Sequence, residues 1–353
     1  AGFAGLATCW HLLLHARERA ERDGRGIAVE VDLIDANGVG RGASSTAALL
    51  HPLNTRGNLS WKGMEALGAT LELMERAAAA TDTMADGPAE RNRDGDGEPT
   101  ALPPFVTQTG VVRVAKDERD LTRFERIRER RGDEMDLRVI KDASGSNGYM
   151  WCSHGYAVDS PRYLEALEKA CHSLAGDVSR WLRAEHGFEA GSTRVNVIKE
   201  RVDSLSSLRG RPMQQQQQEQ QQSQGGAGYS GVILCAGAAV GTLGSFPLKL
   251  SETYAVNMKH EGQQTASAFD FDGVENGEGP RPSLLGQTYV VRPDRGRAIV
   301  GAVHSDDPPP PQQGLKCLNY SLADEEAEAS ESERADLLTM AQKLRTKASH
   351  LLP

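Results

Sequence analysis

The first five residues place the strongest constraint on what this chain can fold into. Ala1, Gly2, Phe3, Ala4 and Gly5 match the end of a GxGxxG loop if one glycine precedes them. In such a loop the middle glycine lets the backbone approach a pyrophosphate, and the last allows close packing of a helix on a strand. The helix N-terminus supplies amide donors and a favourable dipole. Small residues at a helix start also occur for packing alone, so the motif needs support from the residues that follow.

The next segments supply a helix and a strand in the order that such a loop requires. Residues 5–22 carry apolar side chains at helical spacing, and residues 27–34 form a strand-like block. Asp35 and Ala36 come directly after this block. An acidic residue at that place accepts hydrogen bonds from the ribose hydroxyls of adenosine, and its charge disfavours a 2′-phosphate. The spacing from the glycines exceeds the usual value of about 20 residues, and the charged segment 17–25 accounts for the extra length. The alternative for Asp35 is an exposed aspartate at a strand end.

Charge and cysteine content exclude several classes of function. The net charge is −9, so the chain has no overall basic surface of the kind that neutralises phosphates, and a nucleic-acid partner is not indicated. Five cysteines without a CxxC pair predict neither a disulfide framework nor a metal site. The uncharged run 229–248 is interrupted by glycines and a proline, which favours a strand and a turn over a membrane span. No targeting signal is visible, and chloroplast and cytoplasm both stay open.

The segment after Asp35 resembles a known family. Residues 40–52, GRGASSTAALLHP, are similar to the GxGAS segment of D-amino-acid-oxidase-like FAD enzymes. This group includes glycine and sarcosine oxidases and the FAD domain of a bacterial tRNA wobble-uridine modification enzyme. The resemblance implies that Ser44 and Ser45 donate hydrogen bonds to the FAD pyrophosphate and that His51 lies close to the flavin ring. It also places Gly42 and Ala43 beside the cofactor. Ala47 and Ala48 depart from the family, which usually has a glycine there.

Later blocks follow in the order of the same family. Residues 155–161 resemble the G-x-VDP segment, residues 200–205 the strand whose valine meets adenine, and residues 231–237 the VVLAAG strand. Residues 289–301 look like the hairpin of the substrate domain. The resemblance therefore adds further neighbours of FAD to those already named: Val202, Cys235, Ala236 and Gly237.

The expected architecture is α/β, a Rossmann-type FAD-binding domain with an antiparallel β-sheet substrate domain. Helices are predicted over 64–78 and from a capping serine at Ser160, strands over 111–114, 195–198, 202–208 and 231–234, and a hairpin over 288–303. The basic and acidic stretch 119–138 is typical of a solvated helix face.

The FAD-binding parts are 1–78 and 151–250, with a Gln-rich insertion at 214–228. The substrate parts are 101–150 and 251–307, with a polar insertion at 79–100 and a Pro-rich break and acidic helix at 308–353. The family pattern implies that the first strand and a C-terminal FAD-closing segment lie outside this chain.

In family chemistry FAD takes a hydride from the carbon that bears an amine, and oxygen reoxidises the flavin. The resemblance thus implies oxidation of a C–N bond in a small amine or amino acid. Tyr254, Tyr289 and Arg292 are candidates to bind a substrate carboxylate, Arg292 because a guanidinium fork suits that group. Each of the three also fits a structural role.

Within the family, the chain is most similar to a plant and algal group near the tRNA-modification domain, on the basis of Leu50-His51-Pro52 and Trp61-Lys62-Gly63. Two alternatives stay open, a nicotinamide-dependent dehydrogenase and a degenerate flavoprotein relative that acts as an interaction module.

Overall fold

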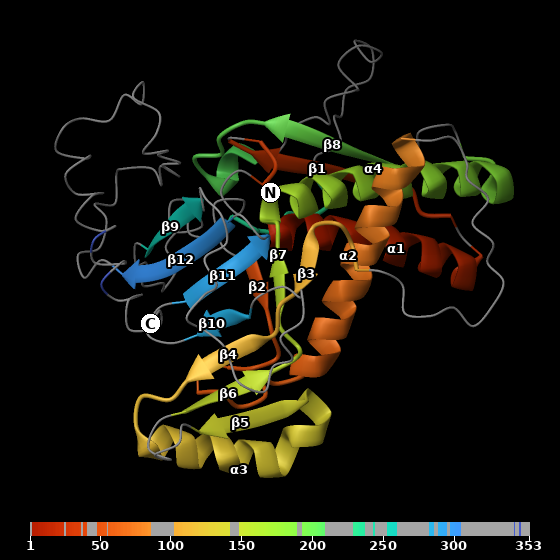
Figure 1. Cartoon of the computed structure of the whole chain (residues 1–353). Coiled ribbons are helices and arrows are strands. Elements are labelled where there is room, and N and C mark those ends of the chain that lie inside the picture. Colours follow the sequence, from red (N-terminus) through yellow and green to blue (C-terminus); the bar gives the residue numbers. More distant parts are fainter. Residues whose placement is uncertain are drawn as a thin grey trace, which may run out of the picture.

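The computed structural model describes residues 2–24, 26–36, 38–40, 48–54, 56–85, 102–141, 148–188, 193–208, 229–236, 253–259, 282–285, 289–294 and 297–304, with positions 243, 342 and 346. Helices and sheets alternate along the chain, which confirms the predicted α/β class. Figure 1 shows two regions, one built on β1, β8, α1 and α4 and the other on a large sheet covered by α3.

The first region is a parallel strand pair backed by helices. β1 (Glu30–Asp35) pairs in parallel with β8 (Arg194–Lys199), and the two strands end together because Asp35 lies opposite Lys199. α1 (Phe3–Asp23) and α4 (Ser160–His186) pack against each other and, through Leu33 and Val195, against one face of this pair. The predicted helix over 5–22 and strand over 195–198 are confirmed. β1 begins three residues later than the sequence block that predicted it.

α1 forms because its apolar residues recur every three or four positions on one side. That stripe is buried: Leu6, Cys9, Trp10, Leu13, Ala16 and Ala20. The opposite side carries ion pairs such as Arg17–Glu21 at 2.8 Å. The helix ends at Gly24, whose φ of 63° is left-handed and suits a residue without a side chain. The Cys171 thiol of α4 donates a hydrogen bond to the Leu6 carbonyl at 3.6 Å and thus joins the two helices.

A small sheet and a long helix connect the two regions. β2 (Ala48–Leu50) and β3 (Val106–Gln108) both pair antiparallel with β7 (Tyr156–Val158), which lies between them. α2 (Gly63–Ala85) packs on α4 and continues past Ala78, where the sequence predicted its end. Its helical residues therefore include the start of the stretch that was assigned to a polar insertion.

The second region is a seven-stranded sheet drawn from two distant parts of the chain. The first part supplies β4 (Val111–Val114), β5 (Leu137–Lys141) and β6 (Gly148–Cys152); the second supplies β9 (Thr253–Lys259), β10 (Ser283–Leu285), β11 (Tyr289–Asp294) and β12 (Arg297–His304). The order is β5-β6-β4-β10-β11-β12-β9. The predicted strand over 111–114 and the predicted hairpin, now β11 and β12, are confirmed. The sheet departs from pure antiparallel pairing at one place, because β10 runs parallel to β4.

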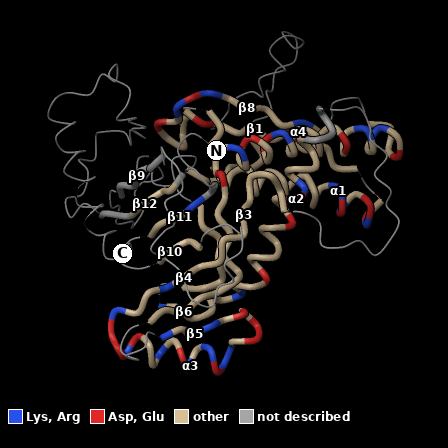
Figure 2. The backbone as a smooth tube through the Cα atoms, viewed as in Figure 1, with Lys and Arg blue, Asp and Glu red and all other residues tan. Residues whose placement is uncertain are grey.

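α3 (Glu118–Met135) covers the outer part of this sheet. Asp117 caps its N-terminus by accepting a hydrogen bond from the Asp120 amide at 2.9 Å. Four apolar side chains point inward, and Phe124 among them is fully buried: Leu121, Phe124, Ile127 and Met135. Figure 2 shows basic and acidic residues mixed along the remaining face. This confirms the prediction of a solvated helix face.

Three local predictions are wrong. Residues 202–208 do not form a strand; the chain instead makes a 3₁₀ turn over Leu205–Leu208, in which the Ser207 amide donates to both the carbonyl and the hydroxyl of Ser204. Such local serine hydrogen bonds compete with strand pairing. Residues 231–234 are irregular, with no ladder to any described strand, and three apolar side chains there stay substantially exposed. The N-cap of α4 is Asp159 rather than Ser160, because the Asp159 carboxylate accepts from the Arg162 amide at 3.4 Å.

Several sequence features fall outside the described residues. These are the Gln-rich run 214–224, residues 86–100 of the polar insertion, the Pro-rich run 308–311, Cys317 and nearly all of the predicted last helix. Within the described ranges no helix is long and apolar enough to cross a membrane. The same residues contain no group of three His, Cys, Asp or Glu side chains placed to hold a metal ion.

The buried thiol of Cys152 gives the fold a testable dependence on pH. Burial raises its pKa to about 11, against about 8.5 for a cysteine in an unfolded chain. A raised pKa in the folded state contributes stability that is fully present below about pH 8.5 and is lost as the pH rises through about 11. We expect the free energy of unfolding to fall by about 3 kcal/mol across this window from Cys152 alone. Urea unfolding at a series of pH values measures this decrease.

The matched variants are Cys152→Ala and Cys235→Ala, since Cys235 is only half-buried. Cys152→Ala is expected to flatten the alkaline decrease, whereas Cys235→Ala should keep the slope of the parent chain. An equal slope in all three proteins would contradict the assignment to Cys152.

Candidate functional site

The N-terminus of α1 presents backbone donors that the helix itself does not use. Gly2 is the N-cap, with extended backbone at φ −99° and ψ −154°, and its carbonyl accepts the first helical hydrogen bond from the Leu6 amide at 3.1 Å. No side chain caps this end. The amides of Phe3, Ala4 and Gly5 therefore have no acceptor within the helix, and the helix dipole adds positive potential there.

The carboxyl ends of β1 and β8 lie at the same end of this region as the α1 N-terminus (Figure 1). The Asp35 carbonyl accepts from the Glu200 amide at 3.1 Å, so the two chain segments stay together beyond the paired strands. Asp35 follows Val31 and Leu33 in strand alternation, which places its half-buried side chain on the face that α1 and α4 cover. Val202 follows β8 within a few residues and is also half-buried.

The segment 231–236 meets α1 at Cys235. The Cys235 thiol and the Thr8 hydroxyl are 4.0 Å apart. The Tyr229 hydroxyl donates to Asp32 of β1 at 2.7 Å and fixes the start of the segment. The structure therefore brings together, at one end of the β1–β8 pair, most of the sequence-predicted residues it describes: Gly2, Phe3, Ala4, Gly5, Asp35, Ala36, Val202, Cys235 and Ala236.

The N-terminus of α4 lies near the N-terminus of α1, but unlike α1 it is capped by a side chain. Phe3 stacks on Tyr163 of α4 with ring centroids 5.9 Å apart, and the centroid of the Phe105 ring is 5.5 Å from that of Tyr163. The Asp159 carboxylate occupies the α4 N-terminus and also pairs with Arg162 at 3.7 Å. A negative charge already satisfies that helix end, so α1, rather than α4, is the helix end open to an anion.

These features fit FAD at the β1–β8 end. Three amide donors at an uncapped helix N-terminus suit a pyrophosphate, and a carboxylate at the end of the adjoining strand suits the adenosine ribose. The remaining predicted contacts, Ala1, Gly42, Ala43, Ser44, Ser45 and Gly237, lie outside the described residues.

His51 lies apart from this group, after β2 and next to the large sheet. Its Nδ1 accepts a hydrogen bond from the Leu53 amide at 3.3 Å, so the ring proton of the neutral imidazole is on Nε2. Burial, and then the charge of Arg113, lowers the pKa of His51 below its ordinary value, so the ring is uncharged at neutral pH. Pro52 holds the loop in place, because its carbonyl accepts from the Ser60 amide at 2.8 Å.

The three candidate substrate residues occupy different parts of the large sheet. Tyr289 lies at the start of β11, and burial raises the pKa of its hydroxyl. Arg292 lies in the stretch of β11 where the register with β12 shifts. Tyr254 lies on the edge strand β9, opposite Val303, and its side chain is outside the described set. Tyr289 and Arg292 are therefore the two candidates whose side chains the structure describes, and both are half-buried.

Sequence reasoning missed Arg113 and Tyr163. Arg113 is the single charged residue of the apolar strand Val111–Val114, and that exception in the pattern could have drawn attention to it. Nothing in the sequence distinguishes Tyr163, because its position in the helical pattern is that of an ordinary core residue. Burial raises its pKa to about 12.

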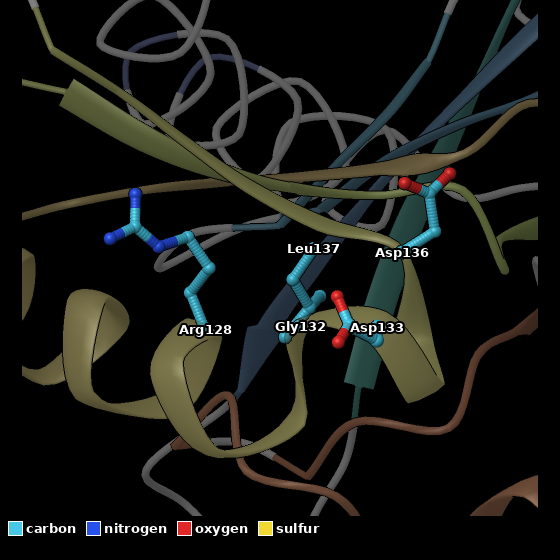
Figure 3. A pocket seen from close by; sticks show the side chains of 5 residues that line it. All are labelled: Arg128, Gly132, Asp133, Asp136 and Leu137. Carbon is cyan, nitrogen blue, oxygen red and sulfur yellow. The ribbon is translucent and has the colours of Figure 1, made fainter.

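A surface pocket lies beside the C-terminus of α3, away from these residues. Figure 3 shows its lining, which comes from the last turns of α3 and the start of β5: Arg128, Gly132, Asp133, Asp136 and Leu137. Asp136 has left-handed backbone, and its amide donates to the Gly132 carbonyl. The pocket is therefore a helix-ending turn rather than a group of side chains suited to catalysis.

One comparison with known proteins identifies a family. Residues 1–352 match the model of one protein family, FAD dependent oxidoreductase. No significant match was found among curated proteins. Solved structures with a related arrangement include a glycine oxidase from Geobacillus kaustophilus, at 15% identity over 78% of this chain and 65% of the oxidase, with a TM-score of 0.48.

Two further similar structures cover more of the chain. An iminodiacetate oxidase from Chelativorans sp. BNC1 is 16% identical over 96% of this chain and 78% of the oxidase, with a TM-score of 0.43. An L-proline dehydrogenase from P. horikoshii is 13% identical over 96% and 75%, with a TM-score of 0.44. The chain spans less than two thirds of the glycine oxidase. Because the family match extends over residues 1–352, the chain belongs to the FAD dependent oxidoreductase family, and its cofactor is FAD.

Proposed function

We propose that this chain is part of an enzyme that oxidises a C–N bond of a small amine or amino acid, with FAD as hydride acceptor and oxygen as the final oxidant. The observation that carries the proposal is the uncapped N-terminus of α1 beside the carboxyl end of β1, within a chain that matches the family over residues 1–352. The similarity of Leu50-His51-Pro52 and Trp61-Lys62-Gly63 to a plant and algal group near the FAD domain of the tRNA wobble-uridine modification enzyme supports a place in that group.

The proposed cofactor contacts use backbone more than side chains. The amides of Phe3, Ala4 and Gly5 would donate to the pyrophosphate, the Asp35 carboxylate would accept from the ribose hydroxyls, and Val202 would meet adenine. When bound, FAD supplies the site that accepts a hydride from the substrate. The protein then has to bind the substrate, orient it and exclude water.

Two described residues suit those tasks. Tyr289 is half-buried on the large sheet, and burial raises the pKa of its hydroxyl further above neutral pH, so the hydroxyl can donate a hydrogen bond to a substrate carboxylate. His51 is half-buried and uncharged, with its Nε2 proton available for donation. Both would bind the substrate without adding a charge next to the carbon that loses its hydride.

The visible absorption spectrum of the purified chain, with and without added FAD, tests the proposal. Flavin bands that persist through gel filtration are expected, followed by bleaching of those bands when amines or amino acids are added without oxygen. A parallel titration with NAD addresses the dehydrogenase alternative. Failure to retain flavin in this chain, and in a version extended by its flanking reading frame, would favour the interaction-module alternative instead.

Replacement of Asp35 tests the ribose contact. Asp35→Asn removes the charge but keeps the size, and we expect FAD affinity to fall about tenfold, the value of one hydrogen bond to a charged group. Fluorescence quenching of the flavin on titration measures the dissociation constant. Asp177→Asn, on the exposed face of α4, is the control and should leave the affinity unchanged. Equal affinity in both variants would remove Asp35 from the proposed site.

A further inference from the structure

Residues 229–236 form a segment that strand pairing does not hold in place. None of the described strands pairs with it, and residues 230–234 are exposed. Tyr229 at one end, and Cys235 and Ala236 at the other, are half-buried. A segment with exposed backbone and few buried contacts opens at a low cost in free energy. Its position therefore depends on the side-chain contacts at its two ends.

Tyr229 attaches the first end of this segment to β1. Its hydroxyl donates a hydrogen bond to Asp32 at 2.7 Å. Asp32 alternates with Leu33 along the strand, so its side chain lies on the face of β1 away from α1 and α4. At the second end, the Cys235 thiol and the Thr8 hydroxyl of α1 are 4.0 Å apart. The segment thus joins β1 to α1, the two elements that carry the proposed contacts with the ribose and the pyrophosphate.

The carboxylate that accepts from Tyr229 is itself fixed by β8. Its Oδ1 atom accepts from Asn196 Nδ2 at 2.8 Å, while Tyr229 donates to Oδ2. Asn196 Nδ2 also donates to Glu30 Oε1 at 3.0 Å, and Arg194 Nε donates to the same oxygen at 2.6 Å. Because Glu30 pairs with Arg194 and Asp32 with Asn196 in the register, these side chains form one network across both strands. A hydrogen bond to an ionised acceptor that is already held in place is among the stronger kinds.

We propose that Tyr229 is a positioning residue for FAD: its hydrogen bond to Asp32 holds residues 229–236 where Cys235 and Ala236 contact the cofactor. This inference rests on the cofactor contacts of the proposed function and does not depend on which substrate is oxidised. When the segment opens, only the molecules that keep it in place bind FAD, so the measured dissociation constant rises as their fraction falls. Loss of one hydrogen bond to a charged group lowers that fraction by up to about tenfold.

Tyr229→Phe tests the proposal because it removes only the hydroxyl. The dissociation constant for FAD, measured by quenching of flavin fluorescence, is expected to rise by about three- to tenfold. The thermal unfolding midpoint without FAD should fall by no more than about 2 °C, since the segment adds no strand pairing to the folded chain. A hydrogen bond with a purely structural role would have the reverse effect, a lower midpoint with unchanged FAD affinity.

The reactivity of the Cys235 thiol reports the position of the segment directly. At one saturating concentration of FAD, labelling by N-ethylmaleimide is followed by mass spectrometry of the peptide that contains Cys235. Labelling requires the segment to open, so the rate should be about tenfold higher in Tyr229→Phe than in the parent chain. The thiols of Cys9, Cys152 and Cys171 are buried and should keep their slow rates.

Two further variants establish that Tyr229 acts through Asp32. Asp32→Ala removes the acceptor, so adding Tyr229→Phe to this variant should weaken FAD binding no further. Ser230→Ala is the matched control, because Ser230 is the exposed neighbour of Tyr229 on the same segment. This control should keep both the FAD affinity and the Cys235 labelling rate of the parent chain.

The outcomes separate this inference from the proposed function. Unchanged FAD affinity in Tyr229→Phe, an unchanged labelling rate of Cys235, or a full second loss of affinity in the double variant would each overturn the positioning role. None of these results bears on C–N oxidation, which is tested by bleaching of the bound flavin. If FAD binds with the expected dependence on Tyr229 but no amine bleaches it, the positioning role stands and only the proposed reaction falls.

Discussion

Gly155→Ala is expected to destabilise the folded chain by about 4 kcal/mol, near the upper limit for a single added methyl group. A Cβ at this position would lie 2.4 Å from the Gly110 carbonyl carbon, 2.4 Å from Val111 Cγ2 and 2.7 Å from the Gly110 oxygen. Two of these three atoms belong to the backbone, so a change of rotamer cannot relieve the contact. The loss should appear in urea unfolding as a lower midpoint with an unchanged slope.

Hydrogen bonds around Gly155 prevent its backbone from moving away from Gly110. The Gly155 carbonyl accepts from the amides of Thr109 and Gly110, at 2.9 and 3.0 Å, and the Gly110 carbonyl accepts from the Ser283 amide at 3.2 Å. Gly155 therefore lies where β7 of the small sheet passes β4 and β10 of the large one. Any displacement there would break hydrogen bonds in both sheets.

Gly176→Ala is the matched control. Gly176 lies within α4, and a Cβ there would meet nothing within 4 Å. Because alanine is the better helix former, this substitution should stabilise the chain by about 0.5 to 1 kcal/mol. If Gly155→Ala changed the free energy of unfolding as little as this control does, the two sheets would not pass each other as closely as the structure has them.

The sequence predicted the elements that repeat a simple pattern. The correctly predicted elements are α1, α2, α4, β4, β8 and the β11–β12 hairpin. The prediction was wrong where a local side-chain hydrogen bond favours a different structure from the one that the apolar pattern indicates. Ser204 takes the Ser207 amide into a turn although residues 202–208 look like a strand, and Asp159 caps α4 one residue before the serine that was expected to do so.

Long-range pairing could not be read from the sequence. β10 joins β4 in parallel although more than 160 residues separate them, and no local pattern encodes that neighbour. The strand register that places Arg113, Leu285 and Tyr289 in one row depends entirely on this pairing. For the same reason the influence of Arg113 on the pKa of His51 could not be predicted, because these two residues come from β4 and from the loop after β2.

Gly2→Asp is expected to weaken FAD binding at least about a hundredfold while slightly stabilising the protein without cofactor. Aspartate is a favoured N-cap residue and gains a few tenths of a kcal/mol over glycine. The extended backbone of Gly2, at φ −99°, accepts a side chain without strain. The new carboxylate would, however, occupy the amides proposed for the pyrophosphate and would repel it by about 4 kcal/mol at a separation of 4 Å near the protein surface. Flavin titration and thermal unfolding measure the two effects on one variant.

Gly2→Asn separates the charge from the cap. Asparagine caps a helix about as well as aspartate, and it competes for the same amides without repelling a phosphate. Its loss of FAD affinity should therefore lie between those of the parent and Gly2→Asp, with a similar gain in stability. If Gly2→Asp bound FAD as tightly as the parent chain, the pyrophosphate would not be at α1. The α4 N-terminus would not be a ready substitute, because Asp159 already places a carboxylate there. The opposite signs expected for stability and cofactor affinity thus test whether this glycine is kept for its ligand or for the helix.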